Sequence, residues 1–174
     1  MMRFWLLALL TTVGWLNISE AFADIPVTNR LSSCPKDRET LVSLLLKDLP
    51  SYTNRVIQRN RKFKDTLNLY ILLAGKPEFE PLKLSNQQYQ PLFTDTTKQV
   101  FFTTLERQYL GNRAVKTENY HWLFLTPTDE GWRMVMLFSR FGSADKNRPP
   151  TPPIEANNSM VGQAIKLWLR DCFF

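Results

Sequence analysis

The sequence has few of the residues on which most enzyme chemistry depends. It contains one histidine, two cysteines and six glycines among 174 residues. Structural zinc sites need about four Cys or His ligands, so this set argues against a metal centre. Neither a G-x-S-x-G nucleophile elbow nor a glycine-rich phosphate loop occurs in the chain. We therefore expect no metal and no cofactor, and we predict a non-enzymatic protein.

Two groups of residues still need to be weighed for catalysis. His121 alternates with Tyr120 and Trp122 on a predicted strand, where a hydrogen-bonded structural histidine at a sheet edge is the commoner role. Glu78 and Glu80 would share one face of a predicted edge strand. Paired carboxylates cleave glycosidic bonds, but charges on an edge strand also prevent edge-to-edge pairing. A carboxylate-dependent hydrolase of cell-wall or polysaccharide material is therefore one alternative function.

The longest apolar run is too short for a comfortable membrane span. Residues 4–16 fall below the roughly twenty residues that a spanning helix needs. Arg3 precedes this run, and Ala21-Phe22-Ala23 follows it, which is the layout of an export signal cleaved after Ala23. We expect residues 1–23 to be removed and residues 24–174 to form a single domain without a transmembrane span. Retention of the run as a membrane anchor is the alternative.

The chain is basic, with a formal net charge of +6. In an exported protein this charge favours anionic surfaces such as lipid headgroups, acidic polysaccharide or an acidic protein, and it disfavours nucleic acid, which is scarce outside the cytoplasm. Five bases without an intervening acid form a candidate anion-contacting patch: Arg55, Arg59, Arg61, Lys62 and Lys64. A solvated helix end, where bases suit the helix dipole, explains the same cluster. A basic module that binds anionic lipid or polymer, with steep salt dependence, is a second alternative function.

The two cysteines, Cys34 and Cys172, lie near opposite ends of the predicted mature chain. An even number of cysteines in an exported protein predicts a disulfide. Closing so long a loop would stabilise the fold by about 5 kcal/mol through the entropy of the unfolded chain. Two free, buried thiols are the alternative.

The spacing of apolar residues predicts an α+β fold. Residues 35–49, with Pro35 at the first helical position, form a predicted helix that Pro50 ends or kinks, and a second helix follows over residues 51–61. A C-terminal helix is predicted over residues 157–172. Its helical spacing puts one apolar stripe toward the core and aims Cys172 inward: Val161, Ala164, Ile165, Trp168 and Cys172. Period-two and apolar runs predict strands at 67–74, 78–84, 100–109, 116–126 and 132–141. Thr128-Asp129-Glu130-Gly131 is predicted to join the last two strands as a hairpin loop. We expect an N-terminal helical pair, a mostly antiparallel sheet of four to six strands and a C-terminal helix packed on it, with the disulfide joining the first and last helices.

The last two predicted strands are apolar on both faces, which is typical of strands that are covered on both sides. The helices supply one cover, and a curled sheet, a partner or a ligand could supply the other. The candidate residues for a ligand or partner surface are Trp122, Phe124, Trp132, Met134 and Met136. Plain burial in the core is the alternative explanation for these five side chains.

Several segments have a familiar pattern. They include residues 48–56, 99–109, 121–126, 149–153 and 168–172, among them Pro149-Pro150-Thr151-Pro152-Pro153 and Trp168-Leu169-Arg170-Asp171-Cys172. Together they resemble a family of small exported cyanobacterial proteins of unknown function, and the resemblance covers most of the mature chain. It implies a cyanobacterial source and the periplasm or the thylakoid lumen as the destination, and it supplies no activity or site residues. Because catalytic residue types are scarce and the central strands have more apolar surface than one covering layer explains, we expect an exported binding or accessory domain. Its expected partner is an unidentified protein or an anionic membrane surface.

Overall fold

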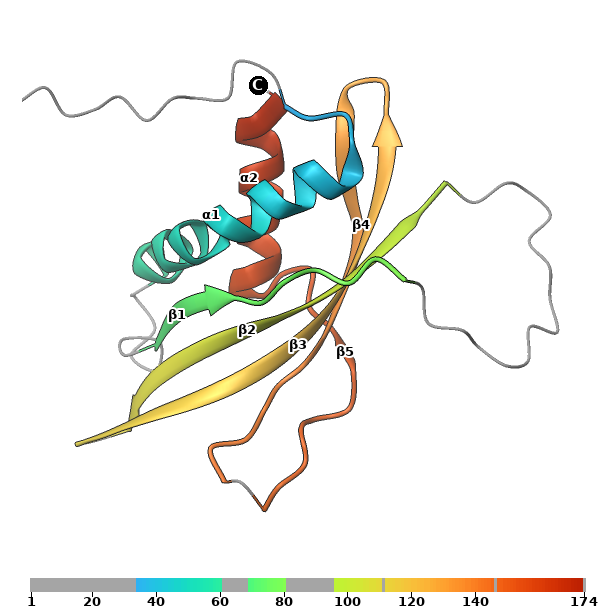
Figure 1. The fold of residues 1–174 in the computed structure, drawn as a ribbon. Helices are drawn as coiled ribbons and strands as arrows, with labels where there is room; N and C mark the ends of the chain where they lie inside the picture. Colours follow the sequence, from blue (N-terminus) through green and yellow to red (C-terminus); the bar gives the residue numbers. More distant parts are fainter. Residues whose placement is uncertain (1–33, 61–68, 81–95, 111, 146, 174) are drawn as a thin grey trace, which may run out of the picture. The chain divides into compact units, whose positions relative to one another are not determined.

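The computed structural model describes residues 34–60, 69–80, 96–110, 112–145 and 147–173. The predicted export signal therefore lies outside the described residues, as do Arg61, Lys62 and Lys64. The elements in chain order are α1 (Arg38–Arg59), β1 (Leu69–Ala74), β2 (Lys98–Leu110), β3 (Arg113–Thr128), β4 (Gly131–Arg140), β5 (Ile154–Glu155) and α2 (Met160–Phe173). Both helices lie on the same side of the sheet (Figure 1), which confirms the α+β class and the packing of the C-terminal helix on the sheet.

The five strands are neighbours in the order in which they occur in the chain, and every pair is antiparallel. This arrangement confirms the predicted antiparallel sheet of four to six strands. β2 and β3 pair over the full length of β2, from Lys98 opposite Leu125 to Leu110 opposite Arg113. A tight turn at Asp129 and Glu130 joins β3 to β4, as the sequence predicts. The short strand β5, which pairs only with Phe138 and Ser139, was not predicted.

The expectation of two N-terminal helices is wrong, because residues 38–59 form one helix with Pro50 inside it. Asp37 begins the helix as its N-cap and accepts a hydrogen bond of 2.8 Å from the backbone N–H of Thr40. Leu45 and Leu49 are buried before the proline, and the stripe continues with buried residues after it: Thr53, Val56 and Ile57. Burying this continuous apolar stripe offsets the backbone hydrogen bond that proline removes.

The predicted apolar stripe of α2 packs into the core. Val161, Ala164, Ile165 and Trp168 are all buried, as their helical spacing predicts. The indole N–H of Trp168 donates to the Asp48 carboxylate of α1 at 2.9 Å. Through this bond and the apolar contacts around it, α1 and α2 form one layer over the sheet.

A disulfide joins Cys34, just before α1, to Cys172 in the last turn of α2, with the two Cα atoms 5.3 Å apart. The pairing that the sequence predicts is therefore present, and it links the two ends of the described chain. Next to it, the indole N–H of Trp132 on β4 donates to the backbone carbonyl of Lys36 at 2.9 Å. The segment before α1 is thus attached both to α2 and to β4.

The sheet has two different faces. The helix face, which points toward α1 and α2, holds the fully buried side chains of Val100, Phe102, Leu123, Leu125 and Leu137. On the opposite face, Phe101, Trp122 and Phe138 occupy directly paired positions on β2, β3 and β4, and all three are half-buried. A β-bulge between Phe124 and Leu125 interrupts the pairing of β3 with β4. The bulge decides which side chains of β4 reach the helices.

Candidate ligand-binding cleft

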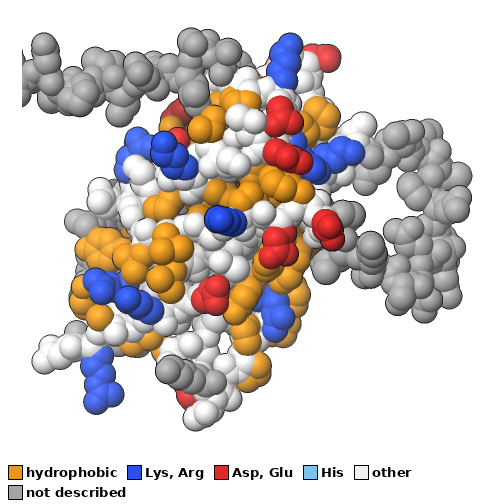
Figure 2. Space-filling view, viewed as in Figure 1, with side chains coloured by type: hydrophobic (Ala, Val, Ile, Leu, Met, Phe, Trp, Pro, Cys, Tyr) orange, Lys and Arg blue, Asp and Glu red, His pale blue; other side chains and the backbone are white. Residues whose placement is uncertain are grey.

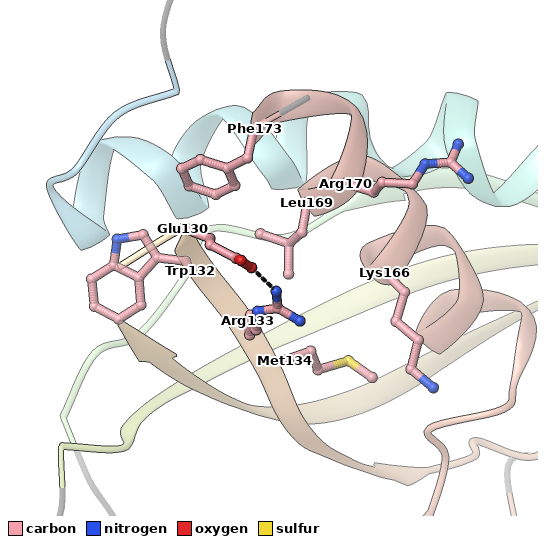
Figure 3. A pocket seen from close by; sticks show the side chains of 8 residues that line it. All are labelled: Glu130, Trp132, Arg133, Met134, Lys166, Leu169, Arg170 and Phe173. Atoms are coloured by element: carbon pink, nitrogen blue, oxygen red, sulfur yellow. Dashed lines mark hydrogen bonds and ion pairs between the residues drawn. The ribbon is translucent and has the colours of Figure 1, made fainter. Parts of the chain in front are cut away.

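A cleft of about 300 Å³ lies between β4 and α2, and we call it the β4–α2 cleft (Figure 3). Four of its lining residues are hydrophobic and four are charged. The hydrophobic ones are Trp132, Met134, Leu169 and Phe173, and the charged ones are Glu130, Arg133, Lys166 and Arg170. Its volume is at the lower end of the range for small-molecule sites, which are mostly apolar with a few polar groups.

The bulge at Phe124 and Leu125 turns Met134 toward α2. Leu125 pairs with Met134, whereas the preceding residue Phe124 pairs with Met136, so Val135 is the extra residue on β4. If β4 paired without a bulge, strict alternation would place Met134 on the same face as Met136. The bulge therefore puts Met134 on the helix face with Leu125, where it lines the cleft.

The structure divides the predicted ligand or partner surface between the two faces of the sheet. Trp132 and Met134 line the β4–α2 cleft. Trp122, Phe124 and Met136 are half-buried on the opposite face, where Trp122 packs against Phe101 with ring centroids 5.2 Å apart and planes tilted by 48°. Phe124 meets Phe138 edge-on at 6.3 Å. These tilted and edge-on contacts are typical of aromatic side chains that pack against each other.

Charged side chains form the rim of the cleft. Arg133 forms an ion pair with Glu130, and Arg170 pairs with Asp171 at 2.7 Å. Lys166 is exposed and forms no ion pair within the part of the chain that the structure describes. On the face of the molecule that Figure 2 shows, hydrophobic side chains lie interspersed with acidic and basic ones. One positive charge at the rim is therefore without a protein counter-charge.

The contribution of α2 to the cleft was missed in the sequence. Lys166, Leu169, Arg170 and Phe173 recur at helical spacing and form one flank of the helix, next to its buried stripe. Because Leu169 and Phe173 only extend an apolar face, their spacing also fits plain core. A cleft residue can be told from a core residue here only by knowing that α2 lies against β4. That placement depends on the tertiary packing and not on the sequence pattern.

Gly131 shapes one end of the cleft. Its backbone has a φ of 115°, which side-chain-bearing residues rarely adopt, and the ring of Phe173 occupies the space where a Cβ atom would lie. We expect Gly131→Ala to displace Phe173 and to lower the free energy of unfolding by about 1–2 kcal/mol. Urea denaturation followed by circular dichroism measures the change. Asp129→Ala, at an exposed position of the same turn, is the control and should stay within about 0.5 kcal/mol of the wild type.

His121 is a structural residue in the interior of the sheet. Only 1% of its surface is exposed; Nε2 lies 2.9 Å from the Thr104 hydroxyl and Nδ1 lies 2.8 Å from the Ser139 hydroxyl. Burial lowers the pKa of His121 from 6.5 to about 4, so the ring is neutral at pH 7. The predicted hydrogen-bonded role is confirmed. The predicted place at a sheet edge is wrong, because β3 is the central strand.

The other predicted site residues do not converge on the cleft. Glu78 forms an isolated bridge with Phe101 through backbone hydrogen bonds, and the side chains of Glu78 and Glu80 are exposed. Arg55 and Arg59 are exposed on the last turns of α1, where the Arg55 guanidinium carbon lies 4.1 Å from the Tyr52 ring centroid. The cation–π contact gives Arg55 a local packing role. The patch of five bases remains a prediction, since three of its members lie outside the described residues.

Comparison with known proteins identifies no relative: no family model, no curated protein and no solved structure matches the chain. Among the described residues, neither helix combines the length and the apolar character that crossing a membrane requires. Function must therefore be inferred from the residues and geometry of the molecule itself.

Proposed function

We propose that this chain is an exported, non-enzymatic binding domain and that the β4–α2 cleft is its ligand site. The observation that carries the proposal is the composition of the cleft: four hydrophobic side chains line about 300 Å³ of space, with charged groups around them. Ligand sites have this combination of an apolar wall and a few polar groups that fix orientation. Only two of the five predicted surface residues, Trp132 and Met134, are part of this site.

The described residues support binding rather than catalysis. Ser139 and His121 are hydrogen-bonded but fully buried on the helix face, so a substrate cannot reach them. Glu130 is the one carboxylate among the residues that line the cleft, and it is already paired with Arg133. A hydrolase of the two-carboxylate type needs a second carboxylate about 5–10 Å away on the other side of the bound sugar. The hydrolase alternative therefore gains no support from the cleft.

The extracytoplasmic location rests on the export signal and on the disulfide. Structural disulfides persist in oxidising compartments and are rare in the cytosol, so the Cys34–Cys172 bond is compatible with export. The resemblance to exported cyanobacterial proteins supports the periplasm or the thylakoid lumen as the destination. We expect the natural protein, isolated from an extracytoplasmic fraction, to begin at Asp24 by mass spectrometry. An intact Met1 in a cytosolic fraction would contradict this part of the proposal.

Binding in the cleft is tested with a neutral probe, octan-1-ol, which matches the hydrophobic wall and has no charge. We expect it to shift the NMR signals of the Trp132 indole and the Met134 methyl group, while those of Trp122 and Met136 on the opposite face stay unchanged. Leu169→Trp, which fills the cleft, should weaken the effect at least fivefold, because the probe loses its space. Equal shifts on both faces of the sheet would contradict a specific site.

A further inference from the structure

The hydrophobic side chains and the free charge of Lys166 lie at different positions along the β4–α2 cleft, and the Glu130–Arg133 pair lies between Trp132 and Lys166 in the close view (Figure 3). In the close view, the rings of Trp132 and Phe173 lie at one end and Lys166 at the other, with Leu169 and Met134 between them (Figure 3). An elongated ligand therefore meets aromatic surface first and aliphatic surface next. It reaches a positive charge at its far end.

The charges of the rim do not cancel. Glu130 neutralises Arg133, and Arg170 extends away from the other side chains of the cleft to its pair with Asp171. Lys166 is left with no ion pair among the described residues, and its ammonium group has three hydrogen-bond donors to offer. The site thus has one uncompensated positive charge next to an apolar wall.

The volume of the cleft limits the size of the ligand. About 300 Å³ holds roughly ten non-hydrogen atoms, if each takes the ~30 Å³ that a water molecule occupies in the liquid. The space inside the cleft therefore fits a single short chain with a compact head group better than the two chains of a phospholipid. A divalent head group would exceed the single free charge of Lys166.

We infer that the ligand of the β4–α2 cleft is a small amphipathic monoanion: a hydrocarbon chain or ring along Trp132, Met134, Leu169 and Phe173, with a carboxylate or similar group at Lys166. This inference rests on the proposed function, since it names the ligand class of the same site. The hydrophobic wall supplies affinity, and Lys166 selects the charge and fixes the direction of binding.

The inference is tested with three probes that share an eight-carbon chain and differ in charge: octanoate, octan-1-ol and octylammonium. Isothermal titration calorimetry at low salt should show octanoate binding at least tenfold more tightly than octan-1-ol, with octylammonium the weakest. Lys166→Glu should lower the octanoate affinity at least tenfold and leave the octan-1-ol affinity within twofold. The preference should also weaken at high salt, because exposed charges are screened.

Lys116→Glu makes the same change of charge and is the matched control for Lys166→Glu. Lys116 is exposed on β3 opposite Arg107, about twelve residues or ~40 Å along the strand from the turn that borders the cleft. The control variant should leave all three affinities within twofold. Equal affinity for octanoate and octan-1-ol, or an unchanged octanoate affinity in Lys166→Glu, would overturn the inference while leaving the cleft as a neutral apolar site. If no probe shifts the Trp132 and Met134 signals, the proposed function itself fails.

Discussion

Reduction of the Cys34–Cys172 disulfide is expected to lower the free energy of unfolding by about 3–5 kcal/mol. The bond closes a loop with a sequence separation of 138 residues, and so long a loop removes much of the entropy of the unfolded chain. A loss of this size is a large fraction of the stability of a typical domain. Urea denaturation with and without dithiothreitol, followed by circular dichroism, measures the difference.

The double variant Cys34→Ser, Cys172→Ser is the control for side effects of the reductant. It should be as unstable as the reduced wild type, and dithiothreitol should not change it further. The NMR signal of the Trp132 indole should also differ between the double variant and the oxidised wild type. The reason is that the hydrogen bond from this indole to the Lys36 carbonyl depends on the segment that Cys34 anchors. Equal denaturation midpoints for the oxidised and reduced wild type would show that the bond contributes nothing to stability.

Acidification from pH 7 to pH 4 is expected to remove about 3 kcal/mol through His121 alone. The pKa of His121 is lowered from 6.5 to about 4 by burial, so the unfolded chain binds a proton at this residue before the folded chain does. The contribution of neutral His121 to the free energy of unfolding is therefore fully present above pH 6.5. This contribution is lost progressively as the pH falls to about 4. Urea denaturation at half-unit pH steps gives the profile.

His121→Gln separates this effect from those of the carboxyl groups. The variant should be less stable at pH 7, because it disturbs the bonds to Thr104 and Ser139, but its stability should change less between pH 6.5 and 4. Burial raises the pKa of Glu106 on the same face of the sheet, which has the opposite sign: protonation removes the cost of a buried charge as the pH falls. Parallel pH profiles for the variant and the wild type, or a histidine that titrates near 6.5 by NMR, would contradict the prediction.

Local patterns were sufficient to predict most of the fold. Alternating and apolar runs identified the long strands β2, β3 and β4, and the turn at Asp129 and Glu130 fixed the antiparallel pairing of β3 with β4. The helical stripe of α2 predicted which of its side chains are buried. Pro50 misled the prediction for α1, because proline is a local signal, whereas the buried stripe that continues past it reflects packing against the rest of the molecule.

The candidate site was only half visible in the sequence. Trp132 and Met134 were selected because they are large and apolar, and so were Trp122, Phe124 and Met136, which lie on the other face. The bulge that separates the two groups has no glycine or other turn residue to mark it at Phe124, Leu125 or Val135. Lys166 could not be recognised, because the importance of a surface lysine depends on which residues the fold places beside it.

The attachment of α2 to β4 has a consequence for the order of events during synthesis. One wall of the cleft is made by the final helix, and that helix is joined to the segment before α1 by the Cys34–Cys172 bond. A nascent chain that has emerged only as far as β5 therefore has no cleft. The proposed ligand binding therefore requires that α2 has been synthesised, and we expect a chain truncated before Met160 not to bind.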